Sequence, residues 1–87
     1  MSGQTRCWLV ERDYAHEDLV TLVYATRDGR YHLTKQLSAN LLFGSSVTAA
    51  IEVADDRLEP VDDSETRERY ASEARRMADQ HDPDDEL

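Results

Sequence analysis

Alternating apolar and polar residues mark the first third of the chain, and this alternation predicts β-strands. Residues 7–12 place Trp8 and Val10 on one side of an extended backbone and their sequence neighbours on the other. A second alternating segment covers residues 19–26, after a short polar connection. Because successive side chains of a strand point to opposite faces, both segments are expected to lie in a sheet that buries at least one face.

The clearest local signal is the pair Asp28-Gly29, which predicts a two-residue type I′ hairpin turn because both residues tolerate positive φ angles. Folding the chain about this turn gives one register and one largely apolar face. Its cross-strand pairs are Thr26 with Tyr31, Tyr24 with Leu33, Leu22 with Lys35 and Val20 with Leu37. The opposite face is mixed and carries Thr21, Val23 and Ala25 across from Gln36, Thr34 and His32. Turn and alternation agree on this register.

Three shorter segments follow the hairpin. Residues 38–44 predict a helical turn with Ser38 as its N-cap. Residues 47–53 fit two patterns, since they alternate as a strand does and their apolar spacing also matches a helix; their β-branched residues favour the strand. Residues 57–61 predict a brief edge strand, limited by Pro60.

The last predicted element is a helix over residues 64–80. Three residues suited to N-capping stand at its start: Asp62, Asp63 and Ser64. An apolar stripe at helical spacing is formed by Tyr70, Ala74, Met77, Ala78 and His81. This order predicts an α+β fold, an antiparallel β-meander of four to five strands with the C-terminal amphipathic helix packed on one face. Residues 1–81 are expected to form this single domain, and residues 82–87 a frayed acidic tail.

The chain is strongly acidic, and the charge is unevenly placed. Nineteen Asp and Glu stand against ten Lys and Arg, for a net charge of −9, and Lys35 is the single lysine. Residues 1–54 carry six acids and five bases, a net charge of −1, whereas residues 55–87 carry thirteen acids and five bases, a net charge of −8. Hydration of the surface is the simplest explanation. The charge also repels nucleic acid and anionic lipid, although a Debye length of about 3 Å in molar salt leaves a nucleic-acid partner open.

The location follows from what the chain contains. The polar N-terminus does not resemble a signal peptide, and no apolar run approaches the length that spans a bilayer. The lone Cys7 excludes an internal disulfide and suits a reducing compartment. We therefore expect a cytoplasmic protein without membrane contact.

Few patterns in the chain predict chemistry. Cys7 lies in an apolar strand, where a buried thiol is inert. The spacing of His16, His32 and His81 is not typical of a metal motif, and the paired aspartates lack the alternating ligands and glycine of a calcium loop. The chain is expected to have no catalytic residue, no metal site and no cofactor, and not to be an enzyme.

Two features are candidates for an interaction surface. One helix covers one face of a sheet, so the mixed face of the hairpin is expected to stay uncovered and to meet a protein partner or a second copy of the chain. The near-neutral body also holds arginines that flank the hairpin turn, near the aromatic residues Trp8, Tyr24 and Tyr31. Phosphate pairing and stacking would suit them to nucleic acid, although balancing neighbouring acids is the simpler explanation. The residues assigned to this surface are Arg12, Thr21, Val23, Arg27, Arg30, His32, Thr34 and Gln36.

The preference for Asp over Glu and for Arg over Lys resembles the surfaces of proteins from haloarchaea that keep concentrated salt in the cytoplasm. Residues 8–12, 47–53 and 81–86 are similar to strings in small haloarchaeal proteins. The resemblance covers most of the chain and implies a halophilic habitat, but no activity, cofactor or site residue. We expect a small non-catalytic protein-interaction or regulatory module of a halophilic cytoplasm. The alternative is a nucleic-acid-associated module that uses the hairpin arginines and aromatics.

Overall fold

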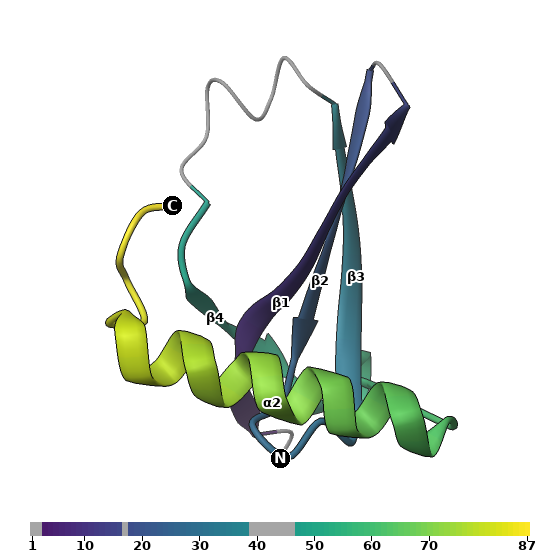
Figure 1. Ribbon diagram of the computed structural model, residues 1–87, viewed down its shortest axis with the longest axis vertical. Helices are drawn as coiled ribbons and strands as arrows, with labels where there is room; N and C mark the ends of the chain where they lie inside the picture. The colour runs from purple at the N-terminus through teal and green to yellow at the C-terminus, as the bar shows by residue number, and fades with distance from the viewer. Residues whose placement is uncertain (1–2, 17, 39–46) are drawn as a thin grey trace.

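A five-stranded antiparallel sheet and a C-terminal helix make up the fold in a computed structural model that describes residues 3–16, 18–38 and 47–87 (Figure 1). The elements are β1 (Gln4–His16), β2 (Leu19–Ala25), β3 (Tyr31–Ser38), β4 (Ala50–Ala54), the 3₁₀ turn η1 (Asp55–Arg57), β5 (Glu59–Pro60) and α2 (Ser64–Gln80). The strand order is β4-β1-β2-β3-β5. The predicted α+β fold is confirmed: β1, β2 and β3 form the meander, and β4 returns to the free side of β1.

The hairpin of β2 and β3 has the predicted register. Its pairs include Tyr24 with Leu33, Leu22 with Lys35 and Val20 with Leu37. The amide of Thr26 donates to the carbonyl of Tyr31 at 3.0 Å, which closes the hairpin where the sequence predicted. The brief edge strand is also confirmed, as β5 pairs with Tyr31 and His32.

The predicted type I′ turn is wrong. The loop holds four residues, 27–30, and among the described residues Gly29 alone has a positive φ, of 73°, whereas type I′ needs two in succession. The physical reason is the side chain of Asp28. Its carboxylate accepts hydrogen bonds from the Thr26 hydroxyl at 2.6 Å and from the Arg30 amide at 3.0 Å. These bonds hold the loop in a wider turn than the backbone alone would choose.

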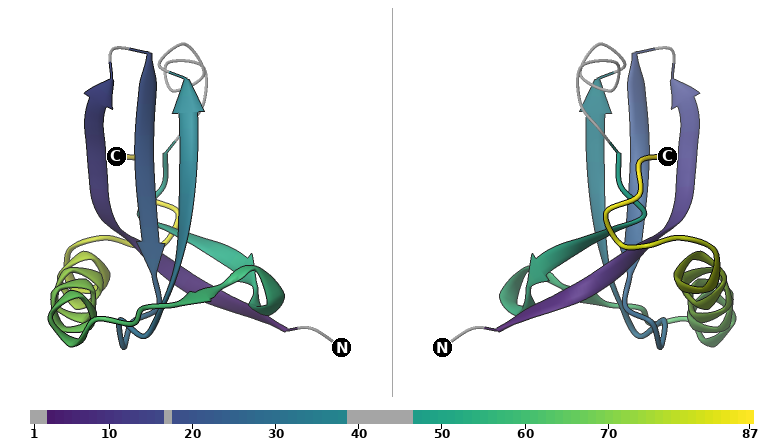
Figure 2. Two further views of the ribbon diagram at one scale, coloured as in Figure 1. Left: turned by 90° about the vertical axis from the view of Figure 1, so that its right-hand side faces the viewer. Right: turned by 90° about the vertical axis from the view of Figure 1, so that its left-hand side faces the viewer.

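β1 is a long strand that serves both halves of the sheet. Its N-terminal part, from Gln4 to Trp8, pairs with β4, and its later residues pair with β2. The register with β2 shifts between Leu9 and Glu11, so Val10 is an extra residue, a β-bulge. Bulges bend a strand and increase its twist. Figure 2 shows the result: the N-terminal half of β1 and the adjoining β4 turn away from β2 and β3.

Each face of the sheet carries a buried cluster. The hairpin face that the sequence marked as apolar belongs to the larger cluster, which contains Cys7, Leu9, Val20, Leu22, Tyr24, Val47 and Val53. The other face carries Val23 and Ala25, and α2 packs on it through Tyr70. The helix therefore covers part of the face that we expected to stay uncovered, and the prediction of an uncovered face is corrected.

The choice of face has a packing reason. Trp8, Ala50 and Ala74 form a third cluster beneath the helix, continuous with the face that carries Val23. Small side chains there let α2 approach the sheet closely. The other face is filled by residues on either side of η1, of which Val53 is buried and Leu58 is packed against it. A different part of the chain thus packs on each face. Alternation within the hairpin does not predict which of the two faces the helix packs on.

α2 begins and ends at the predicted residues. The Asp63 carboxylate caps it by accepting from the Thr66 amide at 3.0 Å and from the Thr66 hydroxyl at 2.8 Å. Tyr70 and Ala74 are buried, Met77 is half-buried, and all three lie against the sheet as predicted. The helix crosses in front of β1, β2 and β3 near one end of the sheet (Figure 1).

The structure describes only part of the segment between β3 and η1. Residues 50–54 form β4, so the strand predicted in this ambiguous region is confirmed there. Ser38 is the last residue of β3, and the rest of the helical turn predicted over residues 38–44 lies outside the described residues.

The C-terminal segment is not a frayed tail, and that prediction is wrong. Ala49 donates its amide to the carbonyl of Asp85, and Ala50 donates to Pro83, both at 2.9 Å. Leu87 in turn donates to Val47 at 2.8 Å. The acidic side chains suggested a solvated tail, but strand pairing is made by backbone groups, which are the same in every residue other than proline. The segment lies along the outer side of residues 47–50 (Figure 2).

Gly29 brings the hairpin loop into direct contact with α2. A Cβ atom built at this position would overlap the carbonyl oxygen of Arg67 and lie 2.7 Å from the amide nitrogen of Ala71. Both are backbone atoms of a helix and cannot move aside alone. Glycine is therefore required twice, by the positive φ and by the contact.

We expect Gly29→Ala to lower the free energy of unfolding by about 2–5 kcal/mol, from about 1–2 kcal/mol for the left-handed backbone and about 1–3 kcal/mol for overpacking. Urea unfolding followed by circular dichroism measures this. Gly3→Ala is the matched control, because a Cβ there meets only the end of the Asp55 side chain, at 3.1 Å, and it should change stability by less than about 0.5 kcal/mol. Equal effects of the two substitutions would contradict the contact.

The loop also predicts a pH dependence. The hydrogen bond from the Thr26 hydroxyl, followed by that from the Arg30 amide, holds the pKa of Asp28 below its ordinary value of 3.8. A carboxylate with a lowered folded-state pKa contributes stability above its unfolded pKa and loses it as the pH falls through the folded pKa. The difference in unfolding free energy between wild type and Asp28→Asn should therefore shrink as the pH falls below about 4.

Urea unfolding of both proteins at a series of pH values between 7 and 2 measures this difference. The control is Asp56→Asn, which removes the charge of an exposed aspartate of η1. A constant difference between wild type and Asp28→Asn across the acid range would show that Asp28 does not act through its charge.

Candidate functional site

A large hollow lined by described residues is the cleft between the hairpin loop and the N-terminal half of β1. Its volume is about 810 Å³, within the range of about 300–1,000 Å³ that is typical of ligand pockets. One wall comes from the loop and its ends, and the other from β1, η1 and the residue after η1. The lining residues are Thr5, Arg6, Trp8, Thr26, Arg27, Asp28, Tyr31, Asp55 and Leu58.

The bend of β1 brings these residues together. Trp8 pairs with Ala25, the last residue of β2, so its neighbours stand beside the start of the loop. Before Trp8 the strand leaves β2 and follows β4, which opens the space between β1 and the loop. The far wall is fastened by the Thr5 hydroxyl, which donates to Asp55 Oδ1 at 2.6 Å, and by the Asp55 amide, which donates to Gly3.

The two carboxylates of the cleft are already hydrogen-bonded within the protein. Asp28 accepts from the Thr26 hydroxyl and the Arg30 amide, and these bonds lower its pKa. Asp55 accepts from the Thr5 hydroxyl. Both acids serve the loop and η1, so they offer fewer free acceptor positions than their number suggests.

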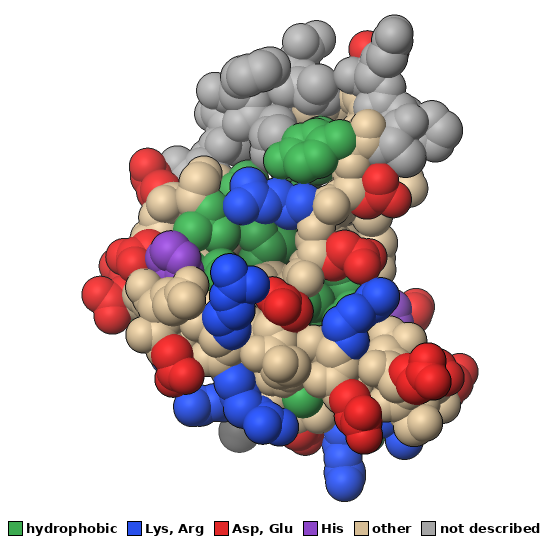
Figure 3. Space-filling view, viewed as in Figure 1, with side chains coloured by type: hydrophobic (Ala, Val, Ile, Leu, Met, Phe, Trp, Pro, Cys, Tyr) green, Lys and Arg blue, Asp and Glu red, His purple; other side chains and the backbone are tan. Residues whose placement is uncertain are grey.

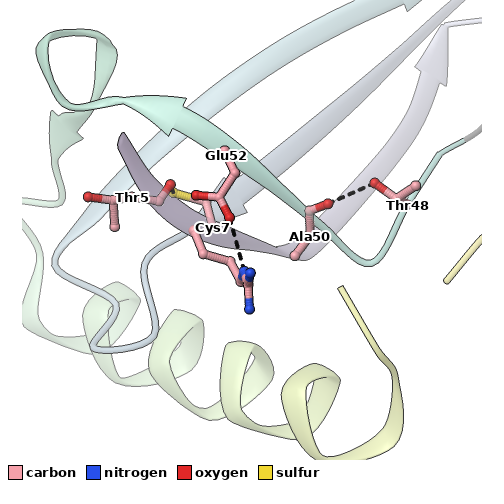
Figure 4. Close-up of polar contacts among 6 residues, drawn as sticks. Thr5, Cys7, Thr48, Ala50 and Glu52 are labelled. Atoms are coloured by element: carbon pink, nitrogen blue, oxygen red, sulfur yellow. Dashed lines mark hydrogen bonds and ion pairs between the residues drawn. The ribbon is translucent and has the colours of Figure 1, made fainter. Parts of the chain in front are cut away.

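The donors of the cleft are less occupied. Arg6 donates through Nε to Glu52 Oε1 at 3.1 Å, which leaves its terminal nitrogens available. Figure 4 shows Glu52 beside Cys7, with this bond as a dashed line. No hydrogen bond or ion pair joins the Arg27 side chain to any other described residue. Trp8 is 6% exposed and its indole N–H likewise has no partner in the described chain. Tyr31, at 45% exposure, presents its ring to solvent.

The residues predicted as an interaction surface fall in three places. Thr21, Val23, His32, Thr34 and Gln36 do share one sheet face, as predicted, but Val23 is buried against Tyr70. The His32 ring lies 6.3 Å from the Tyr70 ring, so α2 also reaches this residue. Thr34 and Gln36 are exposed.

The predicted arginines lie elsewhere. Arg12 pairs with Leu22 and therefore belongs to the opposite face of the sheet. Arg27 and Arg30 are both exposed on the hairpin loop, and of the eight predicted surface residues only Arg27 lines the cleft. The residues that the predicted surface omitted are on the far wall, above all Arg6, Trp8 and Leu58. The sequence did place the arginines of the hairpin turn near Trp8, Tyr24 and Tyr31, but the pairing of β1 with β2 was needed to bring Trp8 and Arg27 to one space.

Other candidate chemistry is accounted for by packing. Cys7 is fully buried, and burial, followed by the charges of Glu52 and Asp55, raises its pKa to about 11. Its thiol donates weakly to the Thr5 carbonyl at 3.7 Å (Figure 4). Across the described residues no group of three or more His, Cys, Asp or Glu is placed to hold a metal ion. In the same part of the chain no helix has the length and apolar character that crossing a bilayer requires.

A smaller hollow lies where α2 meets the bulge of β1. It is lined by Leu9, Val10, Glu11, Arg12, Glu73 and Met77, with a volume of about 160 Å³. Figure 3 shows this side of the molecule: apolar surface lies above α2, bordered by basic and acidic side chains that alternate along the helix. Arg69 pairs with Glu11 at 3.3 Å across the joint. This hollow is too small for more than a side chain, and the cleft beside the loop is the candidate site.

Comparison with known proteins adds a family to this description. No curated protein and no solved structure matches the chain. Residues 1–87 match a family of unknown function, DUF7967, and the chain belongs to this family.

Proposed function

We propose that the protein is a small non-catalytic protein-interaction module, and that the cleft between the hairpin loop and β1 is its docking site. The observation that supports this is the combination of unused donors and accessible apolar surface in one place. Within the described part of the chain Arg27 and the Trp8 indole N–H have no partner, and Tyr31, another lining residue, is 45% exposed. Interfaces are commonly anchored by arginine, tyrosine and tryptophan at a hollow of this kind.

The charge of the cleft favours a protein over a nucleic acid. Its lining holds two arginines and two aspartates, so the cleft does not offer the row of cations that follows a phosphate backbone. The C-terminal third of the chain adds a net charge of −8. A nucleic-acid-associated module is the second candidate function, and the exposure of both Arg27 and Arg30 on the loop is the observation that favours it.

The proposed setting is a halophilic cytoplasm, supported by the excess of Asp and Arg over Glu and Lys. In molar salt the Debye length is about 3 Å, so charges act only at contact distance. Recognition then depends on hydrogen bonds and apolar contact more than on the field of the whole protein. A shaped cleft with unpaired donors supplies both.

A homodimer through an uncovered sheet face is not part of this proposal. α2 occupies the apolar portion of that face, where Val23 and Ala25 are buried. The exposed portion is polar and carries Thr34 and Gln36.

Arg27→Glu tests the docking site. We expect tagged wild-type protein to retain a protein partner from haloarchaeal lysate in multimolar KCl, in a near-equal molar amount to itself. Treatment of the lysate with nuclease should not change this recovery. Reversal of the Arg27 charge, which has no ion-pair partner among the described residues, should reduce recovery at least about tenfold, the effect of losing about 1.4 kcal/mol at one anchor. Arg75→Glu, at an exposed position on α2, is the matched control and should retain the partner.

Three outcomes would overturn the proposal. Equal recovery by wild type and Arg27→Glu would place docking elsewhere. Failure of the wild type to retain any stoichiometric protein would remove the interaction function. Recovery of nucleic acid, with partners lost after nuclease, would favour the second candidate. Circular dichroism of each variant establishes that it is folded before the comparison is made.

A further inference from the structure

We infer that the cleft binds a single carboxylate carried next to an aromatic or other flat apolar group. The inference rests on the proposed function in that it concerns the same cleft, and it specifies the chemistry of the occupant. The occupant that we infer is a protein segment that ends in, or contains, such a pair of groups. A free aromatic acid has the same chemistry, and the titration below distinguishes the two sources.

The hydrogen-bonding capacity of the cleft calls for an acceptor. Its two carboxylates already accept from Thr5, Thr26 and the Arg30 amide. The Arg27 guanidinium offers its full set of N–H donors, and Arg6 keeps its terminal nitrogens beyond the bond to Glu52. An occupant that only donates would find few free positions, whereas an acceptor would find several.

Trp8 adds an independent observation. Its side chain is more than nine-tenths buried, and its indole N–H has no hydrogen-bond partner. No fully buried side-chain nitrogen or oxygen of the described residues is left unpaired, so this N–H keeps contact with solvent. Trp8 is a lining residue of the cleft, and it also packs beneath α2 with Ala49, Ala50 and Ala74. A tryptophan N–H that is otherwise so deeply placed usually has a partner.

The balance of charges sets the charge of the occupant. The charge of Arg6 is shared with Glu52, and Asp28 and Asp55 stand on opposite walls. Arg27 is the one cation of the lining with no counter-charge in the described chain. One negative charge complements it, and the planar guanidinium matches a carboxylate through two parallel hydrogen bonds. A doubly charged phosphate would meet the two aspartates at close range.

The apolar residues of the lining favour an aromatic or other flat apolar group beside the carboxylate. Tyr31 presents a ring that is nearly half exposed, and Leu58 is half-buried on the opposite wall. Aromatic groups pack on such a ring in offset or edge-to-face arrangements. The volume of about 810 Å³ has room for one ring and its carboxylate, together with a short length of attached chain.

The single tryptophan makes the test direct, because its indole N–H gives one isolated signal in a ¹H–¹⁵N spectrum. Full-length ¹⁵N-labelled protein in concentrated KCl is titrated with N-acetyl-phenylalanine, with N-acetyl-phenylalaninamide and with inorganic phosphate. We expect the acid to shift the Trp8 indole signal in a saturable manner. The amide should bind at least about tenfold more weakly, and phosphate should leave the signal in place.

Two variants test the role of Arg27, and a pair of peptides tests whether the carboxylate belongs to a protein segment. Arg27→Gln should weaken binding of the acid at least about tenfold, and Arg75→Gln should leave it unchanged. A pentapeptide Gly-Gly-Gly-Gly-Phe with a free carboxylate that binds more tightly than N-acetyl-phenylalanine would identify a protein segment as the source. Equal affinity would identify a free small acid, and the C-terminally amidated peptide serves as its control.

The inference is overturned if acid and amide shift the signal equally, if Arg27→Gln has no effect, or if no carboxylate shifts it at concentrations of tens of millimolar. Tighter binding of phosphate than of the acid would also overturn it. The titration needs no partner, so its failure is separable from that of the docking proposal. Loss of the captured partner by Arg27→Glu alongside a negative titration would leave docking in place and remove only the carboxylate.

Discussion

The contact between Gly29 and α2 is the constraint on which the arrangement of the molecule depends. The loop backbone lies so close to the Arg67 carbonyl and the Ala71 amide that no side chain fits between them. On its other side the loop is held by the Thr26 hydroxyl and the Asp28 carboxylate. The helix therefore cannot slide along the sheet without displacing a loop that is itself internally bonded. Tyr70, one residue before Ala71, is in this way kept over Val23 and Ala25.

The second determinant is the bend of β1, and it accounts for the candidate site. One extra residue, Val10, lets the same strand pair with β2 along one part and with β4 along another. Where the two halves separate, the backbone of β1 leaves the hairpin and the cleft opens. Trp8 lies at this point of the strand, packs beneath the helix and is also a lining residue of the cleft. Rigid packing of this kind around a hollow is what a preorganised binding site requires, because little ordering remains to be done when an occupant enters.

The parts of the fold that the sequence predicted are those determined by local interactions. The register from Val20 to Leu37 and the bounds of α2 follow from alternation, caps and helical spacing, and the structure confirms them. The turn type was missed because a side-chain bond from Asp28 outweighs the usual preference of an Asp-Gly pair. The face chosen by α2 was missed because both hairpin faces are apolar enough to be covered. The small residues beneath the helix and the close approach at Gly29 distinguish them. Pairing of the last residues with Ala49 and Ala50 uses backbone groups alone and leaves no mark in the side-chain pattern.

The candidate site was predicted only in part for a related reason. Arg27 was identified because it flanks a turn, whereas Arg6 and Trp8 reach the cleft through a strand pairing that joins distant segments. The composition of the whole chain also gives no indication of the free hydrogen-bond donors in the cleft. A net charge of −9 describes the outer surface, most of it beyond residue 54, and says little about a space lined by equal numbers of arginines and aspartates. What distinguishes the cleft is which of those groups are already bonded. Asp28 and Asp55 are engaged, Arg27 is not, and the resulting preference for an acceptor comes from hydrogen-bond geometry that no count of charges contains.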